Sequence, residues 1–158
     1  MNDSNLSNIR HSTAHLLAAA ILDLYPDTLL TIGPSIDTGF YYDLDFVKPI
    51  SEEDLPKIEK KMAEILPTWN SFSHREVTKD EAKEFYKNNK YKQELVDEIA
   101  EKGEKITFYK IGAFEDLCRG GHSENPSKEI GAFKLLHLAG AYWRGSEKNK
   151  MLTRIYGT

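Results

Sequence analysis

One long amphipathic segment near the N-terminus most strongly limits the folds available to this chain. Between residues 7 and 24, apolar side chains recur at spacings of three and four, and Pro26 follows soon afterwards. Side chains three and four positions apart lie on the same face of a helix, so this spacing predicts a helix with one apolar face. Proline cannot continue the pattern, and we therefore expect the helix to end before it.

Strand-like runs separate this helix from the next one. Residues 29–32 and 39–46 are rich in aromatic and β-branched side chains, and Gly33 with Pro34 indicates a turn between the two runs. Residues 106–111 are again strand-like. The last third of the chain, residues 114–156, combines many glycines with short apolar runs, which favours strands and turns.

Three further helices are predicted between these runs, at 51–66, 78–86 and 92–102. The first two of these helices begin with a pattern typical of helix starts, in which Ser or Thr is followed three positions later by Asp or Glu. Pro67 ends the first, and Gly103 ends the third. The order of elements predicts an α+β fold, in which a mostly antiparallel sheet packs with helices.

The composition is that of one globular domain. The chain has 158 residues, of which 40% are hydrophobic and 29% are charged, so residues 1–158 are expected to form a single domain with its own core. Its formal net charge of -4 excludes the basic excess that drives nonspecific binding of nucleic acid. Any contact with nucleic acid must then be local, or assisted by a partner module.

Cysteine usage and hydropathy predict a cytoplasmic location. The single cysteine cannot form an internal disulfide, and no apolar run reaches the ~18 residues of a membrane span. The sequence also lacks a charged and then apolar signal segment at its start. We therefore expect a reducing compartment and no contact with a membrane.

Two pairs of potential ligands stand far apart in the sequence. His11 and His15 are four residues apart in the predicted helix, which places both imidazoles on one face. Cys118 and His122 are also four apart, but two glycines between them favour a turn. If the pairs converge, zinc is the natural metal for one thiolate and three imidazoles. Taken alone, the His pair is more commonly explained by a solvated helix face, and the Cys-His stretch could be a core cysteine or a tight turn.

Four stretches make the chain recognisable, namely HSTAHLL, IGPSIDTGFYYDLDF, EDLCRGGH and LAGAYWRGSEKNKMLTRIYGT. In their order and spacing they resemble the N-terminal editing domain of bacterial-type threonyl-tRNA synthetases, and the resemblance covers nearly the whole chain. The His pair is a weak motif by itself, whereas the AYWRG and RIYGT region is specific. Alanyl-tRNA synthetases and freestanding alanine editors are similar, but their cysteine motif usually reads CGGTH and they lack the AYWRG ending.

The resemblance implies that the chain hydrolyses the ester between serine and threonine-specific tRNA. Serine lacks one methyl group of threonine, and a binding pocket gains only ~1–3 kcal/mol from such a difference, so a second site must remove the error. A smaller editing pocket could admit serine and exclude threonine. The implied partners are the 3′ end of the tRNA that carries serine and the remainder of the synthetase, whose aminoacylation domain would follow residue 158.

The resemblance also assigns candidate roles to residues of this sequence. His11 and Lys92 would orient or deprotonate the attacking water, and the lysine would steady the developing oxyanion. Asp116 would bind the α-ammonium group of the substrate. The remaining matches would shape the pocket or contact the substrate, and they are His15, Cys118, His122, Gly33 and Tyr42.

The metal remains an open alternative at this stage. Threonyl-type editing domains are understood to work without a metal, whereas alanine-type relatives bind zinc through the four residues equivalent to His11, His15, Cys118 and His122. We therefore expect no required cofactor, with zinc at these four residues as the second possibility and a Cys118 nucleophile as the third. A freestanding trans editor, or a tRNA-binding module that zinc stabilises without catalysis, would also fit. Activity on D-amino acids is left undecided.

Overall fold

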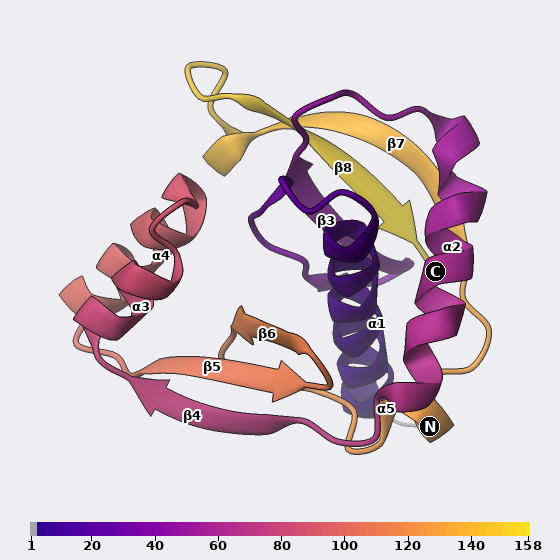
Figure 1. The fold of residues 1–158 in the computed structure, drawn as a ribbon, viewed down its shortest axis with the longest axis horizontal. Helices are drawn as coiled ribbons and strands as arrows, with labels where there is room; N and C mark the ends of the chain where they lie inside the picture. Colours follow the sequence, from indigo (N-terminus) through magenta and orange to yellow (C-terminus); the bar gives the residue numbers. More distant parts are fainter. Residues whose placement is uncertain (1–2) are drawn as a thin grey trace.

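A central helix, α1, organises the structure. The computed structural model describes residues 3–158, and in it α1 (Asp3–Leu24) runs through the middle of the molecule (Figure 1). The predicted helix is confirmed, although it begins at Asp3. Every residue from Ser12 to Ile21 is buried, and three consecutive alanines, 18–20, allow neighbouring elements to approach closely. The middle of α1 is thus covered on all sides, as expected for a helix inside a core.

A five-stranded antiparallel sheet packs against α1. Its order is β1-β3-β8-β7, with β2 paired to β3. Phe40, Tyr42 and Leu44 alternate along β3 and are buried in the core that α1 shares with the sheet. The strands are β1 (Leu29–Leu30), β2 (Ser35–Ile36), β3 (Gly39–Asp45), β7 (Leu135–Tyr142) and β8 (Met151–Gly157).

A second sheet of three antiparallel strands has the order β4-β5-β6. Helices α3 and α4 cover one of its faces through a separate core cluster that includes Ala82, Val96 and Phe108. Asn89 caps α4, because its side-chain oxygen accepts from the backbone N–H groups of the first helical turn. The elements are β4 (Ser73–Val77), α3 (Lys79–Phe85), α4 (Lys90–Glu101), β5 (Ile106–Ile111) and β6 (Phe114–Leu117).

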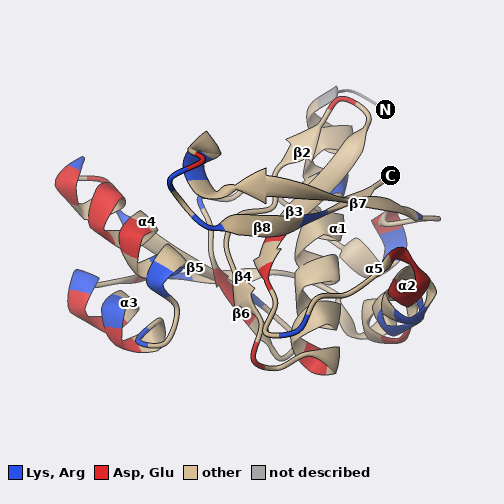
Figure 2. Ribbon diagram, turned by 90° about the horizontal axis from the view of Figure 1, so that it is seen from above, with Lys and Arg blue, Asp and Glu red and all other residues tan. Residues whose placement is uncertain are grey.

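The remaining helical elements lie beside α1. Helix α2 (Leu55–Ile65) packs against α1 through Leu55, Ile58 and Met62, and the short α5 (Pro126–Glu129) follows the glycine-containing loop after β6. Single 3₁₀ turns at 52–54, 66–68 and 143–145 complete the chain. Charged residues gather on α2, α3 and α4, while most of α1 is free of them (Figure 2).

The predicted α+β class is confirmed, with differences in detail. All strand pairs are antiparallel, but they form two sheets where the sequence indicated one. Strand β4 was not predicted, because all its residues except Val77 are polar and exposed, which hides the alternation of an edge strand. The run 29–32 contains only a two-residue strand, and the four-residue α5 was also missed. That residues 1–158 form one domain stays a prediction.

No helix within residues 3–158 combines the length and the apolar character needed to cross a bilayer. This agrees with the hydropathy of the sequence.

The close approach of β3 to β8 predicts a specific sensitivity at Gly39. A Cβ atom there would overlap the backbone carbonyl oxygen of Gly157, which cannot move without breaking strand pairing. We expect Gly39→Ala to lower the free energy of unfolding by about 1–3 kcal/mol, as overpacking does. Urea unfolding followed by circular dichroism measures this. Gly131→Ala is the matched control, because nothing lies near its Cβ position, and equal stability of the two variants would contradict the packing argument.

Candidate active site

Helix α1 presents two imidazoles to the interior. His11 and His15 lie one turn apart, and their Nε2 atoms are 2.9 Å from each other. His15 is only 5% exposed, whereas His11 is partly exposed. The helical spacing thus produces direct contact between the rings, and His11 is the member of the pair that solvent reaches.

The loop after β6 brings Cys118 and His122 to the same place. Gly120 and Gly121 have φ angles of +114° and +83°, which lie in the region that favours glycine, and they let the chain turn back on itself. Cys118 Sγ lies 3.3 Å from His11 Nε2 and 3.3 Å from His122 Nε2. The predicted turn is confirmed, and the two pairs converge although more than 100 residues separate them.

The loop is fastened to α1 by a buried hydrogen bond. The backbone N–H of Ser123 donates to the hydroxyl oxygen of Ser12 over 2.8 Å, so the position of His122 is tied to the helix that carries His11 and His15. Phe72 stacks on His122 with ring centroids 4.2 Å apart, which fixes the plane of the imidazole.

The three imidazoles favour the thiolate form of Cys118. Burial alone would raise the pKa of this thiol, but hydrogen bonds from His11, His122 and His15 lower it to about 3. The backbone N–H of Gly120 also donates to the sulfur over 3.4 Å. Burial lowers the pKa of His122, while Cys118 acts in the opposite direction. A thiolate among imidazoles is therefore the stable state near neutral pH.

Asp116 is the buried centre of a second set of contacts. Its Oδ1 atom accepts from Lys92 Nζ at 2.8 Å, from the Tyr86 hydroxyl at 3.0 Å and from the backbone N–H of Leu117 at 2.9 Å. Lys92 and Asp116 are each 2% exposed. A lysine in a helix and a single carboxylate usually lie on a solvated surface, and here neither does.

The other oxygen of Asp116 connects this centre to the histidines. Oδ2 accepts from the Tyr42 hydroxyl at 3.1 Å and lies 3.4 Å from His15 Nδ1, which is close enough for charge attraction but not aligned for a hydrogen bond. Burial opposes charge on His15, yet Asp116 and Cys118 together raise the pKa of His15 to about 9. Burial would raise the pKa of Asp116, but Lys92 and His15 hold it well below its usual range.

Gly33 belongs to the same assembly through Tyr42. A Cβ atom at Gly33 would overlap the Tyr42 ring, so the absence of a side chain allows this ring to reach Asp116. The structure thus brings together all eight residues that the sequence singled out, in one chain of contacts. Burial and Asp116 raise the pKa of Tyr42, which keeps its hydroxyl a donor.

Three aromatic residues of this site were missed by the sequence analysis. Tyr86 bridges Asp116 and the backbone N–H of Leu117, Phe72 stacks on His122, and Tyr109 lies 4.6 Å from His122 between ring centroids. Phe72 lies in a segment without periodicity, and the other two occupy positions that read as ordinary apolar positions. No local pattern could have identified them.

The four ligand atoms can hold a metal ion. His11, His15, Cys118 and His122 offer one atom each, and all four atoms lie within 4.8 Å of one another. A tetrahedral zinc site separates its donors by roughly 3.3–3.6 Å, given the usual Zn–N and Zn–S bond lengths. The sulfur–nitrogen distances of 3.3 Å and the His11–His15 distance of 2.9 Å are each a few tenths of an ångström shorter than tetrahedral zinc requires, about 3.6 Å for sulfur–nitrogen and about 3.3 Å for nitrogen–nitrogen. The donor set therefore fits zinc in chemistry, and small outward shifts of these side chains would fit it in size.

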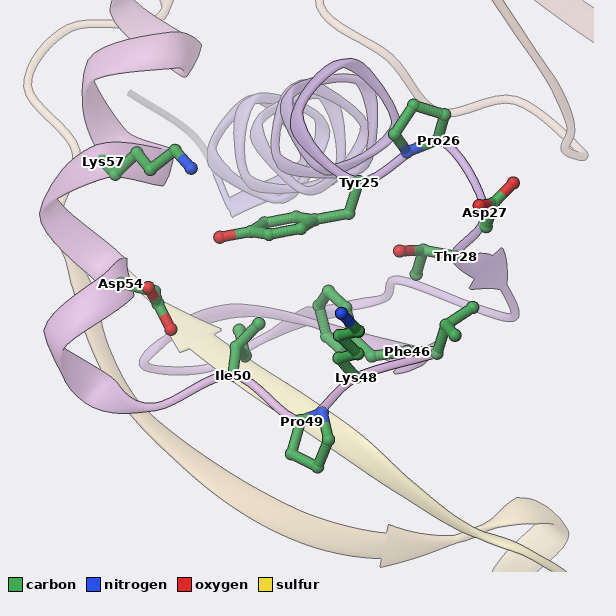
Figure 3. A pocket seen from close by; sticks show the side chains of 11 residues that line it. Tyr25, Pro26, Asp27, Thr28, Phe46, Lys48, Pro49, Ile50, Asp54 and Lys57 are labelled. Carbon is green, nitrogen blue, oxygen red and sulfur yellow. The ribbon is translucent and has the colours of Figure 1, made fainter.

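A separate pocket lies away from these residues (Figure 3). It is bounded by Tyr25 at the end of α1, by Phe46 and Ile50 in the loop after β3, and by Lys57 of α2. None of the residues that line it belongs to the histidine and cysteine cluster or contacts Asp116. The cluster and Asp116 lie instead where α1, α4, β3, β6 and the loop after β6 meet.

Comparison with known proteins shows which sequences this chain is similar to. The family described as "Threonyl and Alanyl tRNA synthetase second additional domain" matches residues 106–156, which include Asp116, Cys118 and His122. The threonine–tRNA ligase of Rubrobacter xylanophilus is 55% identical over 150 residues, covering 95% of this chain and 23% of the relative. That of Borrelia recurrentis is 51% identical over 157 residues, covering 99% and 27%.

A third relative matches the chain with similar identity and coverage. The threonine–tRNA ligase of Staphylococcus carnosus is 52% identical over 157 residues, which is 99% of this chain and 24% of the relative. The chain therefore spans about a quarter of the length of the relatives that it matches.

The contacts around Asp116 predict that loss of the Tyr86 hydroxyl lowers the stability of the fold. Tyr86→Phe keeps the ring but removes a donor to a buried carboxylate and an acceptor for the Leu117 N–H. Hydrogen bonds to charged groups are worth about 1.5–3 kcal/mol, and we expect a loss of this size in the free energy of unfolding. Tyr142→Phe is the control, because Tyr142 is 40% exposed. Urea unfolding measures the free energy of unfolding of both variants. Equal values for Tyr86→Phe and Tyr142→Phe would show that the Tyr86 hydroxyl contributes nothing to stability.

Proposed function

We propose a function on the premise that the chain belongs to the threonyl and alanyl tRNA synthetase second additional domain family, as the editing-domain region of a threonyl-tRNA synthetase. The proposed reaction is hydrolysis of the ester that joins serine to threonine-specific tRNA. The observation that carries the proposal is the convergence of His11, Cys118 and His122 beside the buried pair of Lys92 and Asp116. The proposed partners are the 3′ end of that tRNA and the rest of the synthetase, in a reducing cytoplasm.

His11 is the proposed general base. It is partly exposed, so a water molecule can reach it, and an imidazole is suited to accept a proton near neutral pH. The Cys118 thiolate, 3.3 Å from His11 Nε2, would stabilise the imidazolium that forms when water gives up its proton. In this account the thiolate acts through its charge, and the water oxygen attacks the ester carbonyl. The bond between the carbonyl carbon and the ribose oxygen of the tRNA then breaks, and the ribose oxygen takes up the proton held by His11, which leaves free serine and uncharged tRNA.

Lys92 and Asp116 are proposed to complete the site. Lys92 Nζ uses one N–H on Asp116 and retains two, which supports the expected role in steadying the oxyanion. Asp116 already accepts from four donors, so an α-ammonium group of the substrate would have to displace one of them. We therefore propose that Asp116 chiefly positions Lys92 and His15, and that ammonium binding at Asp116 is secondary.

His15, Cys118 and His122 are proposed to bound the space for the substrate side chain. Their packing, with Phe72 stacked on His122, leaves the cluster little freedom to widen. A pocket with such walls can admit a hydroxymethyl group and clash with one further methyl, which is the asymmetry that editing requires. Tyr42 of β3, with Gly33 in the segment before β2, would support this wall.

Substitution of the base tests the proposal. We expect His11→Ala to reduce the deacylation rate of seryl-charged threonine-specific tRNA by about 10²–10⁴-fold, the usual contribution of a general base. Threonyl-charged tRNA should be hydrolysed more slowly than seryl-charged tRNA by the wild-type chain. His137→Ala, a substitution of an exposed histidine on β7, is the matched control and should keep the wild-type rate. Equal rates for the wild type and His11→Ala would refute the assignment.

Removal of metal is a separate test. Zinc would be held by His11, His15, Cys118 and His122 and, when bound, would polarise a carbonyl or activate water. We propose that hydrolysis does not require it, so dialysis against a chelator should leave both the deacylation rate and the thermal unfolding temperature unchanged. Stoichiometric zinc in the purified chain, with unfolding on chelation, would favour a zinc-stabilised module instead.

A further inference from the structure

The AYWRG motif, residues 141–145, lies outside the candidate site, at the turn between β7 and β8. Trp143 of this motif is buried, and its ring packs edge to face against Tyr91 with centroids 5.2 Å apart. Leu152 completes this apolar cluster, and Leu95 packs against it. Because Tyr91 and Leu95 belong to α4, the turn covers one side of the helix that carries Lys92.

Glu94 of α4 contacts both polar side chains of the turn. Its Oε2 atom accepts from Trp143 Nε1 over 2.8 Å, and its Oε1 atom lies 3.0 Å from Arg144 Nε. Arg144 also donates through Nη1 to Glu98 Oε1, one helical turn further along α4, over 2.7 Å. Trp143, Arg144, Glu94 and Glu98 thus form a clasp that joins α4 to the five-stranded sheet.

The backbone of Arg144 is held in a conformation that a side chain disfavours. Its φ of +57° lies in the left-handed region, and within residues 3–158 no other residue except glycine has a positive φ. Such a conformation persists in a residue with a side chain only where surrounding contacts hold it. Glycine would occupy the position without strain, so what arginine adds here is the contact of its guanidinium group with Glu94 and Glu98.

Helix α4 connects the two sheets. Its first turn is fixed to the five-stranded sheet, because Asn89 Nδ2 donates to a backbone carbonyl oxygen of β1 over 2.9 Å and the Tyr91 hydroxyl donates to Asp45 over 2.7 Å. Lys92 follows directly on another face of the helix and reaches Asp116 of the three-stranded sheet. The place of the Lys92 ammonium group therefore depends on how α4 is held against the five-stranded sheet.

From this arrangement we propose that Glu94 and Trp143 are positioning residues of the hydrolysis, which hold α4 so that Lys92 reaches the site. The inference rests on the proposed function, because Lys92 is the group proposed to steady the oxyanion. Within residues 3–158, the contacts of Glu94 and Trp143 include neither Asp116 nor the histidine and cysteine cluster, so both act through α4. A misplacement of about 1 Å by a mutation far from the reacting groups can lower a rate by about 100-fold.

Steady-state deacylation of seryl-charged threonine-specific tRNA tests the positioning. We expect Glu94→Ala to lower kcat by roughly 10-fold and to leave KM within about twofold of the wild type, because the weakened interaction is one made in the transition state. Glu94→Gln keeps an oxygen that accepts from Trp143 Nε1, and it should recover most of the lost rate. An unchanged kcat in Glu94→Ala, or a failure of Glu94→Gln to exceed it, would overturn the proposal.

The same helix provides a matched control. Glu101→Ala removes another exposed glutamate, in the last turn of α4, and should leave kcat and KM unchanged. Both substitutions place alanine at an exposed helical position, which favours retention of the fold. A loss of kcat in Glu101→Ala as large as that in Glu94→Ala would show a general effect of charge on α4 and would overturn the proposal.

The effect of Glu94 on the rate must pass through Lys92. In a chain that already carries Lys92→Met, Glu94→Ala should change the single-turnover rate by less than about twofold, because residues that act as a unit are not additive. An equal reduction in both backgrounds would show that Glu94 acts by another route, which would overturn the proposal.

The side-chain ¹⁵N NMR signal of Lys92 separates this inference from the proposed function, since it requires no ester. We expect Glu94→Ala to shift or broaden this signal and Glu101→Ala to leave it unchanged. If the wild type hydrolyses no ester while the signal moves in Glu94→Ala, the positioning of Lys92 stands and the hydrolytic function fails. If the wild type hydrolyses the ester while Glu94→Ala matches it in kcat and in the signal, the function stands and the positioning fails. Absence of hydrolysis together with an unmoved signal overturns both.

Discussion

The ion pair between Lys92 and Asp116 is the interaction around which the site is assembled. Each of these residues is 2% exposed, and burying a charge costs several kcal/mol unless a partner and further hydrogen bonds compensate for it. Here the compensation comes from Tyr42, Tyr86 and the backbone of Leu117. These donors come from different elements, so satisfying one carboxylate requires β3, the end of α3, α4 and β6 to meet.

The same carboxylate sets the charge of the histidine that faces it. His15 is favoured as imidazolium between Asp116 and the Cys118 thiolate, so the buried site contains two cations and two anions, with Lys92 as the second cation. Alternating charges of this kind hold the side chains in fixed positions without a net charge. His11 stands at the partly exposed side of this arrangement, where it contacts both His15 and Cys118. Its placement agrees with the role of base that we propose.

The sequence predicted the convergence of the two ligand pairs better than it predicted their surroundings. Helical spacing placed His11 beside His15, and paired glycines correctly indicated a turn between Cys118 and His122. Both signals are local, and local geometry determines both outcomes. The resemblance to editing domains contributed Lys92, Asp116, Gly33 and Tyr42, because nothing in their immediate neighbours distinguishes a buried ion pair from two surface charges.

What the sequence could not provide depends on contacts between distant segments. Tyr86 looks like an apolar position of a short helix, and only the fold shows that its hydroxyl meets Asp116. Strand β4 was missed because most of its residues are polar and exposed, so no alternation of apolar and polar side chains marks it. Sheet register and ring stacking depend on contacts between distant segments, so both could be recognised only in the structure.

A double-mutant cycle on Lys92 and Asp116 tests most directly whether this ion pair organises the site. The free energies of unfolding of Lys92→Met, Asp116→Asn and the double variant would be measured against the wild type by urea denaturation. Each single substitution leaves a buried partner uncompensated, so the double variant should be more stable than the sum of the single effects predicts, by about 1–3 kcal/mol. Additivity within about 0.5 kcal/mol would show that the two groups are independent and would contradict the account.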